Sequence, residues 1–189
     1  MTVADEAGAP PIGRGQSYDR VTIALHWAVA VIVVLQWCSG QTIDWFPKGD
    51  ARVDARSVHI ILGSTLTALL ILRMAWRTFY GARLPPSSEG VAGIAAITMH
   101  YALYGALITI VMLGILGTTL RGDSIFGLFH IPRIGDYTDA ARHSAADQIV
   151  GWHGLVANVT LGLAALHAGA ALIHHYLSPG KVLYRMRLH

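Results

Sequence analysis

Four long apolar segments constrain the fold of this 189-residue chain more than any other feature. They run approximately over residues 21–39, 58–76, 91–120 and 149–177, and roughly 20 apolar residues are enough to cross the hydrocarbon core of a bilayer. Charged residues make up 13% of the chain, about half the share of a typical soluble domain. We therefore predict an all-α fold in which residues 18–187 form a transmembrane four-helix bundle, with no room for a separate soluble domain.

Charged residues and turn-forming prolines mark the ends of the apolar segments. We expect the charged stretches of residues 44–56 and 121–147 to form loops, and the Gly-, Ala- and Pro-rich residues 1–17 to form a disordered cytoplasmic tail. Cys38 is the only cysteine, which excludes a disulfide or an iron–sulfur cluster within one chain, and we interpret it as a small packed residue.

An even number of spans places both termini on one side of the membrane. The terminal side carries eight basic residues and the opposite side six; these are Arg14, Arg20, Arg73, Arg77, Arg83, Lys181, Arg185 and Arg187 against Lys48, Arg52, Arg56, Arg121, Arg133 and Arg142. By the positive-inside rule this excess predicts cytoplasmic termini.

Histidines are nearly the only ionisable residues inside the predicted spans. They are His26, His59, His100, His153, His167, His174 and His175. Ionisable groups within a span are costly and mark functional sites. Because no carboxylate lies in the span interiors, the set indicates metal or haem binding rather than a proton or cation pathway.

The histidines can be paired by their depth in the membrane. His153 and His167 are fourteen residues apart on one helix, so they share a face and lie about 21 Å apart along the axis. Because successive spans alternate in direction, His26 reaches the layer of His167 near the termini, and His59 reaches the layer of His153 on the opposite side. Two imidazoles close both axial positions of a haem iron, which suits electron transfer. His174 is an alternative ligand on the terminal side.

Glycines beside the histidines predict room for a flat macrocycle between the helices. Glycine lets a ring approach the backbone, although small residues also serve ordinary packing of membrane helices. The glycines concerned are Gly63, Gly151, Gly154, Gly162 and Gly169.

The chain resembles the bacterial cytochrome b561 family in the order and spacing of short motifs from Tyr18 to about Arg187. The motifs are Tyr18-Asp19-Arg20 with Leu25-His26-Trp27, Ser57-Val58-His59-Ile60, Gly151-Trp152-His153-Gly154, Gly162-Leu163 to Leu166-His167-Ala168, and His174-His175-Tyr176. The resemblance implies a four-helix bundle of the bacterial inner membrane that binds two b-type haems. It also implies that the axial ligands of the haem irons are His26, His59, His153 and His167.

The family resemblance also implies an activity. Members exchange electrons with quinone, and at least one branch is a superoxide oxidase that passes electrons to ubiquinone, so we expect an oxidoreductase with superoxide as the periplasmic donor. Eight residues on the side opposite the termini could steer this anion, although seven aspartates share the same connections; the eight are Lys48, Arg52, Arg56, Arg121, Arg133, Arg142, His130 and His143. The alternative is a haem-bearing membrane anchor that conducts electrons for a partner dehydrogenase or hydrogenase, without catalysis of its own.

Five further residues are candidates for contacts with quinone or with haem propionates. They are Arg73, Arg77, His100, His174 and His175, and the two arginines are equally suited to anchor the helix at the membrane interface. The expected partners are the lipid bilayer, quinone and a small anionic donor, with no nucleic acid. A redox partner protein or a second copy of the chain remains open.

Overall fold

Four long helices make up most of the chain in the computed structural model, which describes residues 17–85, 90–177 and 182–187. They are α1 (Arg20–Thr42), α2 (Asp50–Phe79), α3 (Gly90–Arg121) and α4 (Asp139–Leu177). All four are long and apolar enough to cross a membrane, so the predicted all-α transmembrane four-helix fold is confirmed. The predicted tail lies outside the described residues except for Ser17.

Short elements complete the fold at the helix ends. The 3₁₀ helices are η1 (Ile43–Trp45) and η2 (Val182–Met186), and a small antiparallel hairpin pairs β1 (Ser124–Ile125) with β2 (Phe129–His130). The sequence analysis did not predict this hairpin, because two-residue strands are too short to show an alternating pattern.

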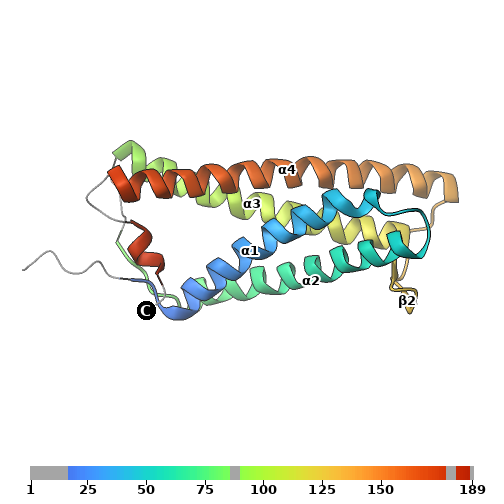
Figure 1. The fold of residues 1–189 in the computed structure, drawn as a ribbon, viewed down its shortest axis with the longest axis horizontal. Helices are drawn as coiled ribbons and strands as arrows, with labels where there is room; N and C mark the ends of the chain where they lie inside the picture. Colours follow the sequence, from blue (N-terminus) through green and yellow to red (C-terminus); the bar gives the residue numbers. More distant parts are fainter. Residues whose placement is uncertain (1–16, 86–89, 178–181, 188–189) are drawn as a thin grey trace, which may run out of the picture.

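The helices pack as two pairs (Figure 1). α1 contacts α2 and α3 contacts α4 along their lengths, whereas the pairs meet mainly where α1 runs obliquely toward α4. A small core of Val29, Leu66, Leu70 and Leu107 lies where the helices meet. We call the end with η2 and the start of α1 the terminal end, and the end with β1 and β2 the hairpin end. Helices of one pair therefore face helices of the other pair across the interior of the bundle.

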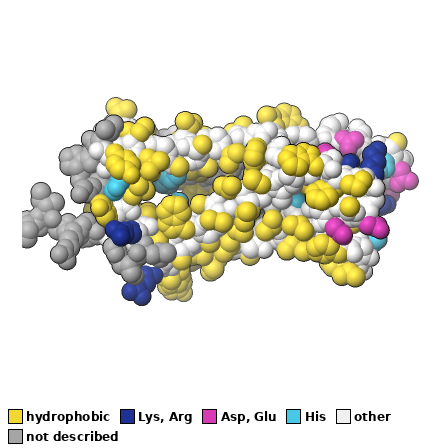
Figure 2. All heavy atoms as spheres, viewed as in Figure 1, with side chains coloured by type: hydrophobic (Ala, Val, Ile, Leu, Met, Phe, Trp, Pro, Cys, Tyr) yellow, Lys and Arg dark blue, Asp and Glu magenta, His cyan; other side chains and the backbone are white. Residues whose placement is uncertain are grey.

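Most large apolar side chains of the helices are exposed on the protein surface, because the bilayer and not the protein covers them. On the face shown in Figure 2, apolar side chains cover the middle of the bundle and charged ones gather toward its two ends. Cys38 is also exposed. The expectation that it is a small packed residue is therefore wrong.

The helices extend beyond the predicted spans at the hairpin end. α2 begins at Asp50 and α4 at Asp139, and α3 includes Arg121, so the prediction that residues 44–56 and 121–147 form loops is wrong for residues 50–56, 121 and 139–147. Both helices begin with an aspartate, which the helix dipole favours in the first turn. Hydropathy detects only the apolar part of such a helix, and the polar turns beyond it escape notice.

The hairpin is anchored on the start of α2 by a buried hydroxyl and a shared carboxylate. Ser57 is fully buried and accepts a hydrogen bond from the backbone N–H of Phe126 at 2.8 Å. The buried carboxylate of Asp123 pairs with Arg56 at 3.2 Å and with Arg121 at 2.9 Å. These contacts fix the hairpin beside the predicted haem ligand of α2.

The terminal end is held together by Asp19, which caps the N-terminus of α1. Its carboxylate accepts hydrogen bonds from Thr22, from Nε1 of Trp76 at 2.9 Å and from the backbone N–H of Ala82 at 3.1 Å. Partial burial raises the pKa of Asp19, but these hydrogen bonds outweigh that effect and hold the pKa well below its usual range. The ionised carboxylate therefore ties the start of α1 to the end of α2.

Candidate functional site

Two pairs of histidine rings face each other across the bundle. His59 on α2 and His153 on α4 have ring centroids 6.1 Å apart, with their planes at 80°; we call them the hairpin-side pair. His26 on α1 and His167 on α4 have centroids 6.3 Å apart, with their planes at 75°; we call them the terminal-side pair. The structure thus brings together the histidines that were paired by depth. Helix α4 is continuous between its two histidines, which places the pairs about 21 Å apart along it.

The spacing within each pair fits two imidazoles that bind opposite sides of one metal ion. With a metal–nitrogen distance of about 2 Å, and with the nitrogen about 1.1 Å from the centre of its own ring, the two centroids would lie about 6.2 Å apart. A direct hydrogen bond between the rings at about 2.9 Å would bring the centroids to about 5.1 Å instead. The observed 6.1 Å and 6.3 Å match the first arrangement.

Each pair offers only two ligands to a metal. Among residues 17–85, 90–177 and 182–187, no three His, Cys, Asp or Glu side chains are placed to hold a bare metal ion. A metal held by either pair would need its remaining ligands from a cofactor, and haem supplies four nitrogens in one plane and leaves two positions for histidine. The residues present fit haem.

The ring of His153 is oriented by helix α3. Its Nδ1 lies 3.0 Å from the carbonyl oxygen of Ile110, which can only accept, so Nδ1 carries the proton and Nε2 keeps the lone pair that a metal requires. A Cβ on Gly114 would lie only 3.2 Å from Cε1 of His153. A glycine at this position of α3 therefore gives the ring its space.

His59 is held by helix α1. Its Nδ1 lies 2.9 Å from Oγ of Ser39 and its Nε2 lies 3.1 Å from Nε2 of Gln36, while a Cβ on Gly40 would lie 3.1 Å from the ring. The sequence analysis missed these three residues, although a glutamine inside an apolar span was a signal. A Cβ on Gly63 would lie 3.0 Å from Nε2 of Gln36. Gly63 therefore makes room for Gln36 and not directly for a macrocycle.

The four glycines of α4 have open space beside them. Within the described residues, no atom of another element lies within 4 Å of a Cβ added at Gly151, Gly154, Gly162 or Gly169. Both a cofactor and lipid acyl chains fit at those positions.

His100 on α3 joins the terminal-side pair. Its ring centroid lies 5.2 Å from that of His167, and its Nδ1 bonds to the carbonyl oxygen of Ala96 at 2.6 Å. The bond within its own helix fixes the ring beside His167. His100 is thus a neighbour of this pair and can contact whatever the pair binds.

Arg73 also lies at the terminal-side pair. It interacts electrostatically with both His26 and His167, and its Nε donates to the hydroxyl of Tyr104 at 3.1 Å. Its Nη1 is buried and has no hydrogen-bond partner among the described residues. A buried cationic donor without a partner is costly, so an anionic or carbonyl oxygen is the chemistry this atom requires.

The other candidates for contacts with quinone or haem propionates lie nearer the terminal surface. Arg77 stacks on the ring of Tyr18 at 4.9 Å and donates to the carbonyl oxygen of Ala82 at 3.1 Å, so its contacts are those of a structural anchor. The ring of His175 packs against that of Tyr184 at 5.3 Å. His174 is half-buried in the last turns of α4.

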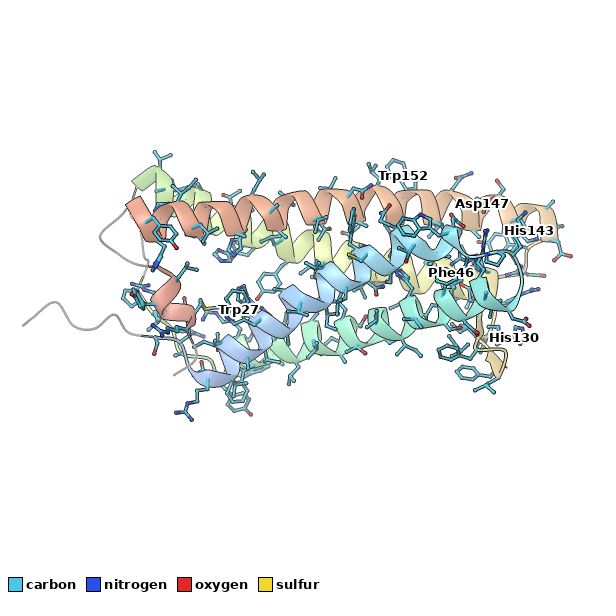
Figure 3. The ribbon with its side chains drawn as sticks, viewed as in Figure 1. Trp27, Phe46, His130, His143, Asp147 and Trp152 are labelled. Carbon is cyan, nitrogen blue, oxygen red and sulfur yellow. The ribbon has the colours of Figure 1, made fainter. Side chains whose placement is uncertain are left out.

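The side chains suggested to steer an anion lie at the hairpin end. Arg52 pairs with Asp44 at 3.2 Å, and the surface positions of His130 and His143 are visible in Figure 3. Six basic residues face seven aspartates here, namely Lys48, Arg52, Arg56, Arg121, Arg133 and Arg142 against Asp44, Asp50, Asp54, Asp123, Asp136, Asp139 and Asp147. The hairpin end as a whole therefore has no excess of positive charge. A local excess of positive charge exists where Arg56 and Arg121 share the carboxylate of Asp123.

Comparison with known proteins identifies the family of this chain. The sequence profile of the prokaryotic cytochrome b561 family matches residues 17–187. The chain belongs to the prokaryotic cytochrome b561 family. A member of this family binds b-type haem and takes part in electron transport, and four membrane-spanning helices make this one a bacterial inner-membrane protein.

Three relatives are similar along nearly their whole length. The chain is 28% identical over 175 residues to a Yersinia pestis protein named probable superoxide oxidase CybB, covering 90% of this chain and 96% of the relative. It is 28% identical over 173 residues to cytochrome b561 homolog 1 of Escherichia coli, covering 89% and 96%. It is also 28% identical over 174 residues to cytochrome b562 of Cereibacter sphaeroides, covering 89% and 94%.

Proposed function

We propose that this member of the family binds two b-type haems and transfers single electrons from superoxide at the hairpin end to ubiquinone at the terminal end. The observation that carries the proposal is the presence of two histidine pairs, each spaced for one iron, at two depths along α4. The relative named probable superoxide oxidase favours superoxide as the donor. The balanced reaction consumes two superoxide anions, one quinone and two protons and yields two molecules of oxygen and one quinol.

The histidines determine which chemistry a bound haem can perform. Held between His59 and His153, or between His26 and His167, haem supplies one-electron oxidation and reduction at its iron. Because each pair supplies two imidazoles, a haem held there would have no free position for oxygen. The four helices are apolar enough to cross a membrane, and a surrounding bilayer keeps bulk water from the pairs, which suits electron transfer over ligand binding.

The arginines beside the hairpin-side pair attract the anionic donor. Arg56 and Arg121 share one carboxylate, that of Asp123, so the cluster keeps one net positive charge. Arg121 interacts electrostatically with both His59 and His153. An anion that reaches this cluster is therefore brought beside the pair that accepts its electron.

The terminal-side pair has the groups that a quinone or a haem propionate requires. The buried Nη1 of Arg73 lacks a partner among the described residues and can donate to a propionate or to a quinone oxygen. Quinone reduction also consumes protons, and histidine exchanges protons near neutral pH. Three histidines, His100, His174 and His175, lie on the same half of the bundle as Arg73. We assign them as further candidates for contacts with the quinone or with haem propionates.

The charge distribution supports an orientation with cytoplasmic termini. The described residues of the terminal end include six arginines and one aspartate, namely Arg20, Arg73, Arg77, Arg83, Arg185 and Arg187 against Asp19. The hairpin end has six basic residues and seven aspartates. Lys and Arg are retained on the cytoplasmic side, so the hairpin end faces the periplasm, where superoxide would arrive.

The experiment follows reduction of the purified protein by superoxide. A reduced-minus-oxidised spectrum first establishes haem, and an enzymatic source of superoxide is then added with and without a ubiquinone analogue. We expect rapid reduction that superoxide dismutase abolishes, and reoxidation when quinone is present. Arg121→Gln should slow the reduction, whereas Lys48→Gln, which removes an exposed charge on the α1–α2 connection, should not.

Each negative result has a defined meaning. Absence of haem bands would refute the cytochrome assignment. Haem that superoxide reduces no faster than in the dismutase control would remove the proposed activity and favour the alternative, an electron conduit for a partner enzyme.

A further inference from the structure

Two polar side chains of α1 converge on His59. Nε2 of Gln36 lies 3.0 Å from the carbonyl oxygen of His59 and 3.1 Å from its ring Nε2. Because a carbonyl oxygen can only accept, this atom of Gln36 is the amide nitrogen, and its second N–H is directed at the ring. The ring Nε2 therefore accepts, which means that it is unprotonated.

Ser39 completes a circuit of hydrogen bonds that begins at the side-chain amide of Gln36 and ends at its backbone carbonyl. With Nε2 unprotonated, the proton of the neutral His59 ring is on Nδ1, which donates to Oγ of Ser39 at 2.9 Å. The Ser39 hydroxyl in turn donates to the carbonyl oxygen of Gln36 at 2.9 Å. Each bond in the circuit fixes the direction of the next, so the circuit selects one tautomer of His59.

The surroundings are shaped for this circuit. A Cβ on Gly40 would lie 3.1 Å from Cε1 of His59, and a Cβ on Gly63 would lie 3.0 Å from Nε2 of Gln36. The side chain of Gln36 is buried inside the bundle, and its Oε1 has no partner among the described residues. Burying an amide in a membrane helix is costly, and a structural role in packing alone would be met equally well by leucine.

We propose that Gln36 and Ser39 are positioning residues that hold His59 in the tautomer that presents Nε2 to the haem iron. A haem iron at Nε2 would take the place of the contact with Gln36, while the bond from Gln36 to the His59 carbonyl would remain. Ser39 keeps its bond to Nδ1 and makes the imidazole a stronger electron donor, which stabilises ferric iron. This inference rests on the proposed assignment of His59 as an axial ligand.

The two positioning residues are expected to have different effects. Removing the Ser39 hydroxyl weakens the ligand in the loaded protein, so both haem affinity and midpoint potential change. The bond from Gln36 to the carbonyl oxygen of His59 holds the backbone of the ligand in both states and does not contact the ring, so its loss changes affinity alone. At His153 the same role belongs to a backbone carbonyl, which substitution cannot remove, so Ser39 is the accessible test position at this pair.

The experiment uses the full chain in a His26→Ala background, which retains only the hairpin-side haem. We expect Ser39→Ala to weaken haem retention roughly ten-fold and to shift the midpoint potential to a more positive value. Ser39→Thr, which keeps the hydroxyl, should restore both. Gln36→Leu should weaken retention without moving the potential. Ser64→Ala is the matched control, because it removes a hydroxyl that bonds only within α2, to Ile60 at 2.9 Å.

Failure of this inference is distinguishable from failure of the ligand assignment. If His59→Ala keeps both haems, His59 is not a ligand and the inference falls with that assignment. If His59→Ala loses one haem but Ser39→Ala matches Ser64→Ala in retention and potential, the ligand assignment stands and the positioning role is wrong. Low-spin electron paramagnetic resonance signals report the state of the iron in every variant. Each substitution is also made in the chain that keeps His26, where retention of the terminal-side haem shows that the bundle is folded.

Discussion

Replacing His153 with alanine should remove one haem and leave the other. The ring contributes one hydrogen bond to the fold, from Nδ1 to the Ile110 carbonyl at 3.0 Å, worth about 1 kcal/mol of a typical total stability of roughly 5–15 kcal/mol, so the bundle should still fold. Because the two pairs lie about 21 Å apart along α4, loss at one should not disturb the other. The ratio of haem to protein should therefore fall from about two to about one.

The measurement is haem content by the pyridine haemochrome assay, normalised to protein in detergent. His143→Ala is the matched control, since it removes a histidine from the polar first turns of the same helix and should leave the ratio unchanged. His167→Ala should also halve the ratio, and the double variant should contain no haem. A ratio that stays near two in the His153 variant, or that falls to zero, would refute the pairing.

Three further predictions concern single residues, one at the terminal end and two beside the pairs. Asp19→Ala removes the cap of α1 and should lower the free energy of unfolding by about 1–2 kcal/mol. Since the pKa of this carboxyl is depressed in the folded protein, its contribution to stability is present above about pH 4 and is lost as the pH falls further. Thermal unfolding of the original protein, Asp19→Ala and Asp19→Asn at pH 7 and pH 3 tests this. Gly114→Val places a branched side chain where even a Cβ would lie 3.2 Å from His153, so spectra should show selective loss of the hairpin-side haem, and an unaltered spectrum would contradict the close approach. Arg73→Gln removes the buried cation beside the terminal-side pair and should lower the midpoint potential of that haem, because a nearby positive charge favours the reduced state. Arg77 stacks on a tyrosine, so Arg77→Gln should have little effect on this potential. Equal shifts in the two variants would refute the special role of Arg73.

The helix ends show where sequence reasoning stops. Hydropathy identifies the apolar core of each span because a bilayer requires about 20 such residues, but α2 and α4 begin eight to ten residues earlier, at Asp50 and Asp139. The helix dipole favours both starts, Arg56 of α2 pairs with Asp123 beside the hairpin, and Arg142 of α4 donates to the carbonyl oxygens of Ile134 and Gly135. None of these interactions carries a hydropathy signal. The same limit hid the hairpin itself, which Ser57 and Asp123 hold in place through contacts distant in sequence.

The sequence by itself determined the number of spans and the depth of each histidine, because both follow from hydropathy and from the rise of a helix. It could not determine which side chains surround a histidine, because that depends on how two helices are rotated against each other. Only the tertiary structure brought Gln36 and Ser39 to His59 and left Arg73 with a buried donor beside His26 and His167. Position along the membrane normal is a local property of the chain, whereas the neighbours of a ring are set by packing between segments far apart in sequence.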